Sequence, residues 1–146
     1  MHMSIWKTQA ITLEALQQNG KNTLVEHLGI EFTEIGDDFI KAKMPVDHRT
    51  HQPMGLLHGG AHVVLAETIG STAANLCLDN TKEYALGLDI NSNHLKGIKS
   101  GFVYGTAKPI HVGSKTQVWE IRITDEKENL LNISRLTMMV LSYSIK

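Results

Sequence analysis

One long apolar segment constrains the fold of this chain more than any other feature. The sequence HGGAHVVLAETIGSTAANLCL predicts a helix from about Gly59 to Leu78, and Glu67 is its single charged residue. A helix that is apolar on nearly every face must be covered on nearly every face. The rest of the chain therefore has to wrap around this helix.

The segments on either side of the helix are typical of strands joined by short turns. Two strands are expected before it, Ile30–Ile35 and Phe39–Met44, and about four more within residues 86–143. Thr12 and Thr23 are suitable N-caps for two short helices ahead of the first strand. Short turns between successive strands favour antiparallel pairing. We therefore predict an α+β fold in which a curled antiparallel sheet encloses one central helix.

Length and composition favour a single domain over residues 1–146, expected in the cytoplasm. Lys and Arg total 14 and Asp and Glu total 15, so the surface is not basic enough to favour nucleic acid. The apolar stretches are shorter than the ~20 residues of a membrane span, and the first residues lack the apolar region of a signal peptide. Cys77, the single cysteine, excludes an internal disulfide and is expected to be a buried apolar filler.

Glu67 is the first candidate for chemistry. It has no Lys or Arg three or four residues away along the helix, so burial is costly unless the carboxylate is paired, hydrogen-bonded or protonated. In one interpretation, Glu67, Ser71 and Asn75 form a polar stripe that meets water. In the other, the stripe faces a ligand at a subunit contact. Desolvation would then raise the pKa of Glu67 toward the working pH, which suits a base or a nucleophile.

The start of the helix is the second candidate. His58 precedes Gly59 and Gly60, and the free amides of a first helical turn can polarise a carbonyl group. Gly59 and Glu67 are ~12 Å apart along the axis at about 1.5 Å per residue, too far for both to touch one small reacting group. If both act in one reaction, they come from two subunits whose helices run antiparallel about a two-fold axis.

Metal and serine-hydrolase chemistry fit the sequence less well. His58 and His62 have the spacing of zinc ligands, but the HExxH arrangement is absent and Glu67 does not share their helical face. We expect no metal, and we expect His62 at the helix surface or at an interface. The sequence also lacks GxSxG, which argues against a Ser-His-Asp hydrolase.

An ordered set of motifs covers nearly the whole chain. It includes RTHQPMGLLHGGAHVVLAETIGS, the opening IWK and ITLEAL, and then GDD, MPVDHRT, GLDINSNHL, KPIHVGSKTQVW and SRLT. With these motifs the chain resembles the hotdog-fold acyl-CoA thioesterases of the phenylacetate-degradation type. It is most similar to the bacterial members that act on aromatic acyl-CoA or acyl-carrier thioesters in menaquinone and enterobactin metabolism. The resemblance implies a hotdog fold, no cofactor, an acyl-CoA or acyl-carrier-protein substrate, a homodimer with shared active sites, and often a dimer of dimers.

The resemblance also implies residue roles. Glu67 is the catalytic carboxylate, either as a base that activates water or as a nucleophile that forms a mixed anhydride. Gln52, His58 and the amide of Gly59 surround the thioester carbonyl from the partner subunit, and Ser71 helps to place water or the acyl head. Lys96 and Lys115 are suitable partners for phosphate. The implied coenzyme A contacts are Gly87, His94, Leu95, Lys96, Gly97, His111, Val112, Gly113, Ser114, Lys115 and Thr116.

Two other functions on the same fold remain open at this point. A hotdog acyl-CoA dehydratase or hydratase is disfavoured because its His-led motif and proline-rich lead-in are missing. A non-catalytic module that senses acyl-CoA is disfavoured because the helix carboxylate, Glu67, is present.

Overall fold

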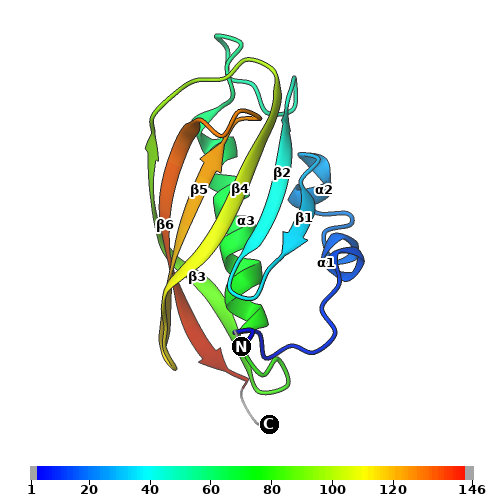
Figure 1. Ribbon diagram of the computed structural model, residues 1–146, viewed down its shortest axis with the longest axis vertical. Coiled ribbons are helices and arrows are strands. Elements are labelled where there is room, and N and C mark those ends of the chain that lie inside the picture. Colours follow the sequence, from blue (N-terminus) through cyan, green and yellow to red (C-terminus); the bar gives the residue numbers. More distant parts are fainter. Residues whose placement is uncertain (1–2, 144–146) are drawn as a thin grey trace.

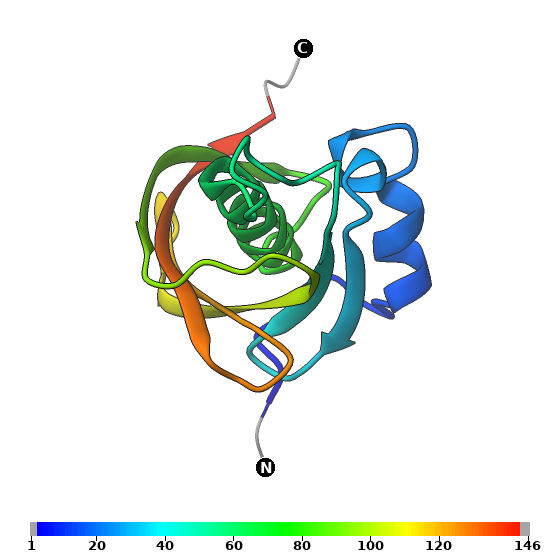
Figure 2. The ribbon, with the colours of Figure 1, turned by 90° about the horizontal axis from the view of Figure 1, so that it is seen from above.

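Helix α3 (Gly59–Leu76) runs through the middle of the molecule, and a sheet curves around it (Figures 1 and 2). The computed structural model describes residues 3–143, so residues 1, 2 and 144–146 of the predicted domain lie outside the described residues. The side of α3 that faces the sheet includes Leu65 and Ile69, which are fully buried. The helix ends two residues earlier than predicted, within the usual uncertainty of helix ends.

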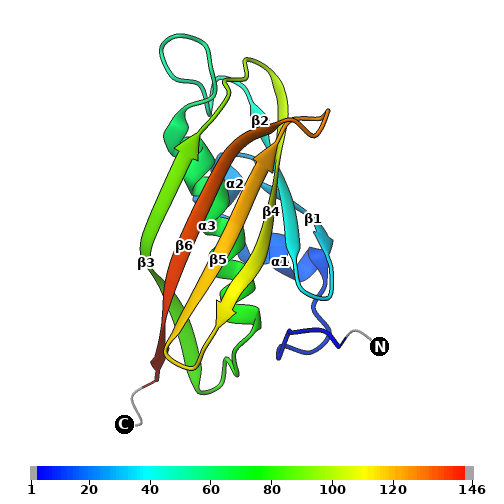
Figure 3. The same ribbon diagram turned by 60° about the vertical axis from the view of Figure 1, so that its left-hand side comes forward.

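Six antiparallel strands form one sheet, as the sequence predicted. The elements in chain order are α1 (Leu13–Asn19), α2 (Leu24–His27), β1 (Glu31–Ile35), β2 (Ile40–Val46), α3, β3 (Glu83–His94), β4 (Gly101–Val112), β5 (Thr116–Thr124) and β6 (Leu130–Ser142). The spatial order is β1-β2-β4-β5-β6-β3. The strand that follows the helix therefore lies at one edge of the sheet, next to the last strand of the chain (Figure 3).

The two short helices lie outside the sheet, beside β1 (Figure 1). Thr12 caps α1 by accepting a hydrogen bond from the Ala15 amide at 3.1 Å, and Thr23 caps α2 by accepting one from the Val25 amide at 3.2 Å. Both predicted caps are confirmed. No helix within residues 3–143 has the length and apolar character that crossing a membrane requires.

The space between α3 and the sheet is filled by apolar side chains. On β5, Trp119, Ile121 and Ile123 point inward with no exposed surface, in the alternation typical of a half-buried strand. Cys77, just after α3, is buried, which raises the pKa of its thiol to about 11. The thiol therefore stays protonated at neutral pH, and its predicted role as an apolar filler is confirmed.

One side of α3 is covered less completely than the sequence suggested. Val63, Val64 and Glu67 are only half-buried, and the sheet leaves this side of the helix open (Figure 2). The neighbouring edge strand β3 exposes Leu86 and Leu88 by 51% and 60%. A single chain thus leaves an apolar helix face and an unpaired sheet edge next to each other.

Candidate active site

A cavity of about 320 Å³ lies at the N-terminal end of α3. It collects residues from three separate segments: the loop before α3, the first turns of α3, and the end of β3 with the residues after it. Its lining includes six predicted site residues, which are Gln52, Gly59, His94, Leu95, Lys96 and Gly97. The structure therefore brings the predicted carbonyl-binding group and one predicted coenzyme A segment into the same place.

Backbone hydrogen bonds hold the walls of this cavity. The Leu57 amide donates to the Ile98 carbonyl at 2.8 Å, which ties the loop before α3 to the connection between β3 and β4. The Leu95 amide donates to the Leu131 carbonyl at 2.8 Å, which ties that connection to β6. The His58 amide donates to the Thr50 carbonyl at 2.8 Å. The cavity is therefore set by the fold, although loops supply much of it.

Gln52 lines the cavity, and its side chain carries a hydrogen-bond donor. Its side-chain oxygen accepts a hydrogen bond from the Met54 amide, and its backbone amide donates to the Leu56 carbonyl at 2.8 Å. With the oxygen engaged, the free group of the Gln52 side chain is its NH₂. A donor at this position suits a carbonyl oxygen, as the predicted role requires.

His58 caps the helix whose first amides it was expected to assist. Its Nδ1 accepts a hydrogen bond from the Gly60 amide at 2.8 Å, so His58 is the N-cap of α3. An accepting Nδ1 places the proton of the neutral ring on Nε2. The side chain is exposed and does not line the cavity that holds Gln52 and Gly59. Within one chain, the structure does not bring His58 to the predicted carbonyl site.

His62 was expected at the helix surface or at an interface, and within one chain it is not at the surface. Its side chain is only 3% exposed and stacks on His94, with the ring centroids 5.6 Å apart. Burial, with a smaller contribution from the charge of His94, lowers the pKa of His62 to about 4, so the ring is neutral at pH 7. Its Nε2 has no hydrogen-bond partner within the part of the chain that the structure describes.

Sequence reasoning missed a polar network beside this histidine. Asn132 Nδ2 lies 3.1 Å from His94 Nδ1 and 2.8 Å from Ser92 Oγ, and Asn132 Oδ1 accepts from Ser134 Oγ at 2.9 Å. Asn132 and Ser134 are buried in β6. The signal was in the sequence: these two polar residues occupy inward positions of a strand whose other inward residues, such as Leu136, are apolar.

Glu67 lies away from this cavity, in the middle of α3. Its carboxylate packs against Gly87 of β3, where any Cβ atom would overlap Glu67 Oε1. No cation pairs with Glu67 among residues 3–143. Ser71 is half-buried one turn further on, and Asn75 exchanges two hydrogen bonds with the Ala85 backbone, at 2.9 and 3.1 Å. Glu67 and Gly87 thus form a second group of site residues, and the hydrogen bonds of Asn75 hold this part of α3 against β3.

The second predicted coenzyme A segment, residues 111–116, lies at the far end of the sheet. His94 pairs with Asn132 on β6, whereas Thr116 pairs with Met139 on the same strand. Those β6 positions are seven residues apart, roughly 23 Å at about 3.3 Å per residue. The hairpin that carries His111 to Thr116 and the segment His94–Gly97 therefore cannot bind one end of a ligand within a single chain.

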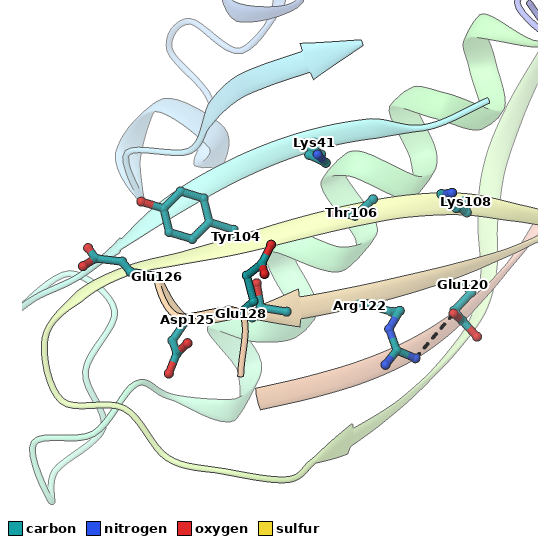
Figure 4. Close-up of a pocket in the computed structure, with 10 residues that line it drawn as sticks. Lys41, Tyr104, Thr106, Lys108, Glu120, Arg122, Asp125, Glu126 and Glu128 are labelled. Carbon is teal, nitrogen blue, oxygen red and sulfur yellow. Dashed lines mark ion pairs between the residues drawn. The ribbon is translucent and has the colours of Figure 1, made fainter. Parts of the chain in front are cut away.

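A larger hollow, about 470 Å³, lies on the outer face of the sheet and is shown in Figure 4. Its walls are charged: Lys41, Lys108 and Arg122 stand on β2, β4 and β5, and acidic residues of the β5–β6 turn close one end. Glu120 and Arg122 form an ion pair at 3.8 Å. No predicted site residue lines this hollow.

Comparison with known proteins gives consistent matches over nearly the whole length. The model of the thioesterase superfamily matches residues 54–132, more than half of the chain. The 1,4-dihydroxy-2-naphthoyl-CoA hydrolase of Escherichia coli (strain K12) is 53% identical over 94% of this chain and 99% of that protein. The proofreading thioesterase EntH of Cronobacter turicensis is 48% identical over 94% and 98%. The crystal structure of a Haemophilus influenzae thioesterase has a TM-score of 0.91 and 51% identity, over 94% of this chain and 95% of that one.

Proposed function

Because the chain belongs to the thioesterase superfamily and is a thioester hydrolase with the hotdog fold, we propose that it hydrolyses aromatic acyl-CoA thioesters to the free acid and coenzyme A. The Escherichia coli relative, named for an aromatic acyl-CoA, supports the acyl class. Thioesters of an acyl carrier protein are the alternative donor of the same acyl group. The cytoplasmic location and the absence of a cofactor stay predictions.

One observation carries the chemistry: two residues that have hydrogen-bond donors, Gln52 with its side-chain NH₂ and Gly59 with its backbone amide, line the cavity at the N-terminus of α3. The first amides of a helix are unpaired and carry the positive end of its dipole. A thioester carbonyl oxygen placed there gains stabilisation as it becomes an oxyanion. Water then adds to the carbonyl carbon, the C–S bond breaks, and the thiol of coenzyme A leaves.

In this proposal Glu67 supplies the other half of the reaction. Its carboxylate removes a proton from the attacking water, or it attacks first and water cleaves the resulting mixed anhydride. Ser71, one helical turn later, helps to hold the water or the acyl head. Lys96 and Lys115 contact the phosphates of coenzyme A.

We further propose that each active site is shared between two subunits. Glu67 is ~12 Å from the Gly59 amide along one helix, at about 1.5 Å per residue. The half-buried face of α3 and the edge strand β3, with its exposed Leu86 and Leu88, lie side by side and are open for a second copy. A two-fold axis at this surface makes the two α3 helices antiparallel and brings the partner's Glu67 toward this chain's Gly59. Pairing of such dimers into tetramers stays a prediction.

A thiol-release assay over aromatic and fatty acyl-CoA thioesters tests the substrate. We expect the highest kcat/KM for aromatic acyl groups. A preference for fatty acyl groups would overturn the acyl class. Hydration of an enoyl-CoA without thiol release would indicate the dehydratase or hydratase, and binding without turnover would indicate the sensing module.

Mixing two inactive variants tests the shared site. Glu67→Ala is combined with His58→Ala, or with Gln52→Ala, whichever is inactive alone. Random assortment makes about half of the dimers mixed, and each mixed dimer holds one intact site, so about a quarter of all sites should work. Activity near a quarter of wild type supports the shared site. No gain over the separate variants, with mixed dimers demonstrated by mass spectrometry, would refute it.

A further inference from the structure

His94 stands directly against the start of α3. A Cβ atom at Gly59 would lie 2.9 Å from His94 Nε2, so the ring fills the space that glycine leaves open. The nitrogen and Cβ of one residue are about 2.5 Å apart, which puts the Gly59 nitrogen and His94 Nε2 within about 5.4 Å of each other. One oxygen at about 2.9 Å from each can bridge two donors up to about 5.8 Å apart. Both groups line the same cavity.

The network behind His94 decides which ring nitrogen carries the proton. Asn132 Nδ2 lies within hydrogen-bond distance of Ser92 Oγ and of His94 Nδ1, while Asn132 Oδ1 accepts from Ser134. In this arrangement His94 Nδ1 is an acceptor. The proton of the neutral ring is then on Nε2, which faces Gly59 and the cavity.

His62 favours the same arrangement. Its Nδ1 lies 3.4 Å from His94 Nδ1, and only one proton fits between the two nitrogens. With that proton on His62, its buried Nε2 is a bare acceptor. With the proton on His94, the buried Nε2 of His62 becomes an N–H donor without an acceptor in the described chain, and such orphaned donors are rarer in proteins than under-satisfied acceptors.

We propose that His94 donates a hydrogen bond from Nε2–H to the thioester carbonyl oxygen, beside the amide of Gly59, and that Asn132 is the positioning residue that fixes this tautomer. The inference rests on the proposed function and adds a donor to it. It also gives a reason for glycine at position 59, because a side chain there would displace the His94 ring.

Two substitutions of similar polarity test whether position 94 needs a hydrogen-bond donor at the place of Nε2 or only a polar side chain. The amide nitrogen of glutamine can reach the position of Nε2, whereas asparagine is shorter and reaches only that of Nδ1. His94→Asn should lower kcat about 10²–10³-fold, the loss found when one oxyanion donor is removed. His94→Gln should stay within about tenfold of wild type, and His27→Gln on the exposed helix α2 should match wild type. Equal losses in His94→Asn and His94→Gln, or no loss in either, would overturn the proposal.

The resting enzyme gives a readout that does not depend on turnover. Long-range ¹H–¹⁵N spectra distinguish the two histidine tautomers, and we expect His94 to carry its proton on Nε2. Asn132→Ser, with folding checked by circular dichroism, should leave a mixture of tautomers and lower kcat more than it raises KM. A pure Nδ1–H tautomer in wild type, or an unchanged spectrum in Asn132→Ser, would contradict the assignment.

The pantetheine arm of the substrate has amide carbonyls that could take the same donor, so the leaving group is varied. Thioesters of a simple alkanethiol lack these amides, and the effect of His94→Asn on kcat should persist with them. If it vanishes, His94 binds the arm and the proposed contact with the thioester carbonyl is wrong. An inactive wild-type protein would overturn the proposed function itself, whereas an active wild type that is insensitive to His94 would overturn only this inference.

Discussion

The two ends of the proposed chemistry differ in how much of their environment one chain supplies. At the start of α3, three segments close a cavity around Gly59, and buried Asn132 holds the histidine beside it. In the middle of the same helix, Glu67 rests on Gly87 of an edge strand, with its other side open. In the proposed chemistry, one chain supplies the carbonyl-binding end, and a second chain of the proposed dimer completes the carboxylate end.

This difference fits the physical demands of the two groups. Donors for an oxyanion work best when they are fixed before the reaction, because reorganisation then costs nothing at the transition state. A carboxylate that acts as a base benefits from an environment without water, and burial at a dimer interface would supply it. In the proposed dimer, the open helix face therefore gains a function as well as cover.

Removing the carboxylate should have the largest effect. Glu67→Gln keeps the shape of the side chain but cannot accept a proton or attack a carbonyl. We expect kcat to fall by roughly 10²–10⁴, with KM for aromatic acyl-CoA largely unchanged. Glu14→Gln, in the exposed turn of α1, is the matched control. A Glu67→Gln variant that keeps more than a tenth of the wild-type kcat would exclude Glu67 as the catalytic carboxylate.

Displacing the carboxylate should cost less than removing it. In Gly87→Ala the new Cβ overlaps Glu67 Oε1, so the carboxylate must move while the ionisable group stays. Small misplacements of a catalytic group can cost up to about 10²-fold, and we expect kcat to fall about 10- to 10²-fold. Thermal unfolding measures whether the fold is kept. Normal kcat in a folded Gly87→Ala protein would show that the resting position of Glu67 does not matter for catalysis.

Some parts of the molecule follow from the sequence alone, and others depend on contacts between distant segments. The helix, the six strands and the inward face of β5 are predictable because local periodicity carries them. The family resemblance assigned Gln52 and Gly59 to the thioester carbonyl and His94 to the coenzyme A contacts, and the structure brings all three to one cavity. Nothing local could show that His62 meets His94, because that contact depends on the β3–β6 register and on a bulge between Gly87 and Asp89. The exposure of Leu86 likewise depends on the place of β3 at the edge.

The stability of the protein in acid tests the environment of buried His62. The pKa of His62 is about 4 in the folded protein, below the ordinary histidine value of 6.5, so the unfolded chain binds a proton first as the pH falls. The titration of His62 should therefore lower the free energy of unfolding by about 2 kcal/mol when the pH falls from 7 to 5. His94, which stacks on the His62 ring, and Asn132, which contacts His94, carry no negative charge to offset this cost.

Urea unfolding at pH 7 and pH 5 measures that cost. In His62→Ser the loss of stability over this range should be smaller than in wild type by about 2 kcal/mol, whatever the stability of the variant at pH 7. The other histidines are present in both proteins and cancel in the comparison. Identical pH dependence in the two proteins would mean that His62 titrates normally in the folded state.

The smallest expected effect is at the exposed lysines proposed to hold the phosphates of coenzyme A. Lys96 lines the cavity, whereas Lys115 lies in the β4–β5 hairpin at the far end of the sheet. Exposed ion pairs contribute about 0.2–1 kcal/mol, so Lys96→Ala or Lys115→Ala should raise KM for acyl-CoA by a factor of roughly 1.4 to 5 and leave kcat nearly unchanged. Pantetheine thioesters lack the nucleotide, and their KM should not change. In a shared site, the two lysines either bind nucleotides in different parts of the dimer or come from different subunits. The rise in KM of the double variant should therefore be no larger than the product of the two single effects. An equal rise in KM for both substrate types would assign these lysines to folding or to the pantetheine arm instead.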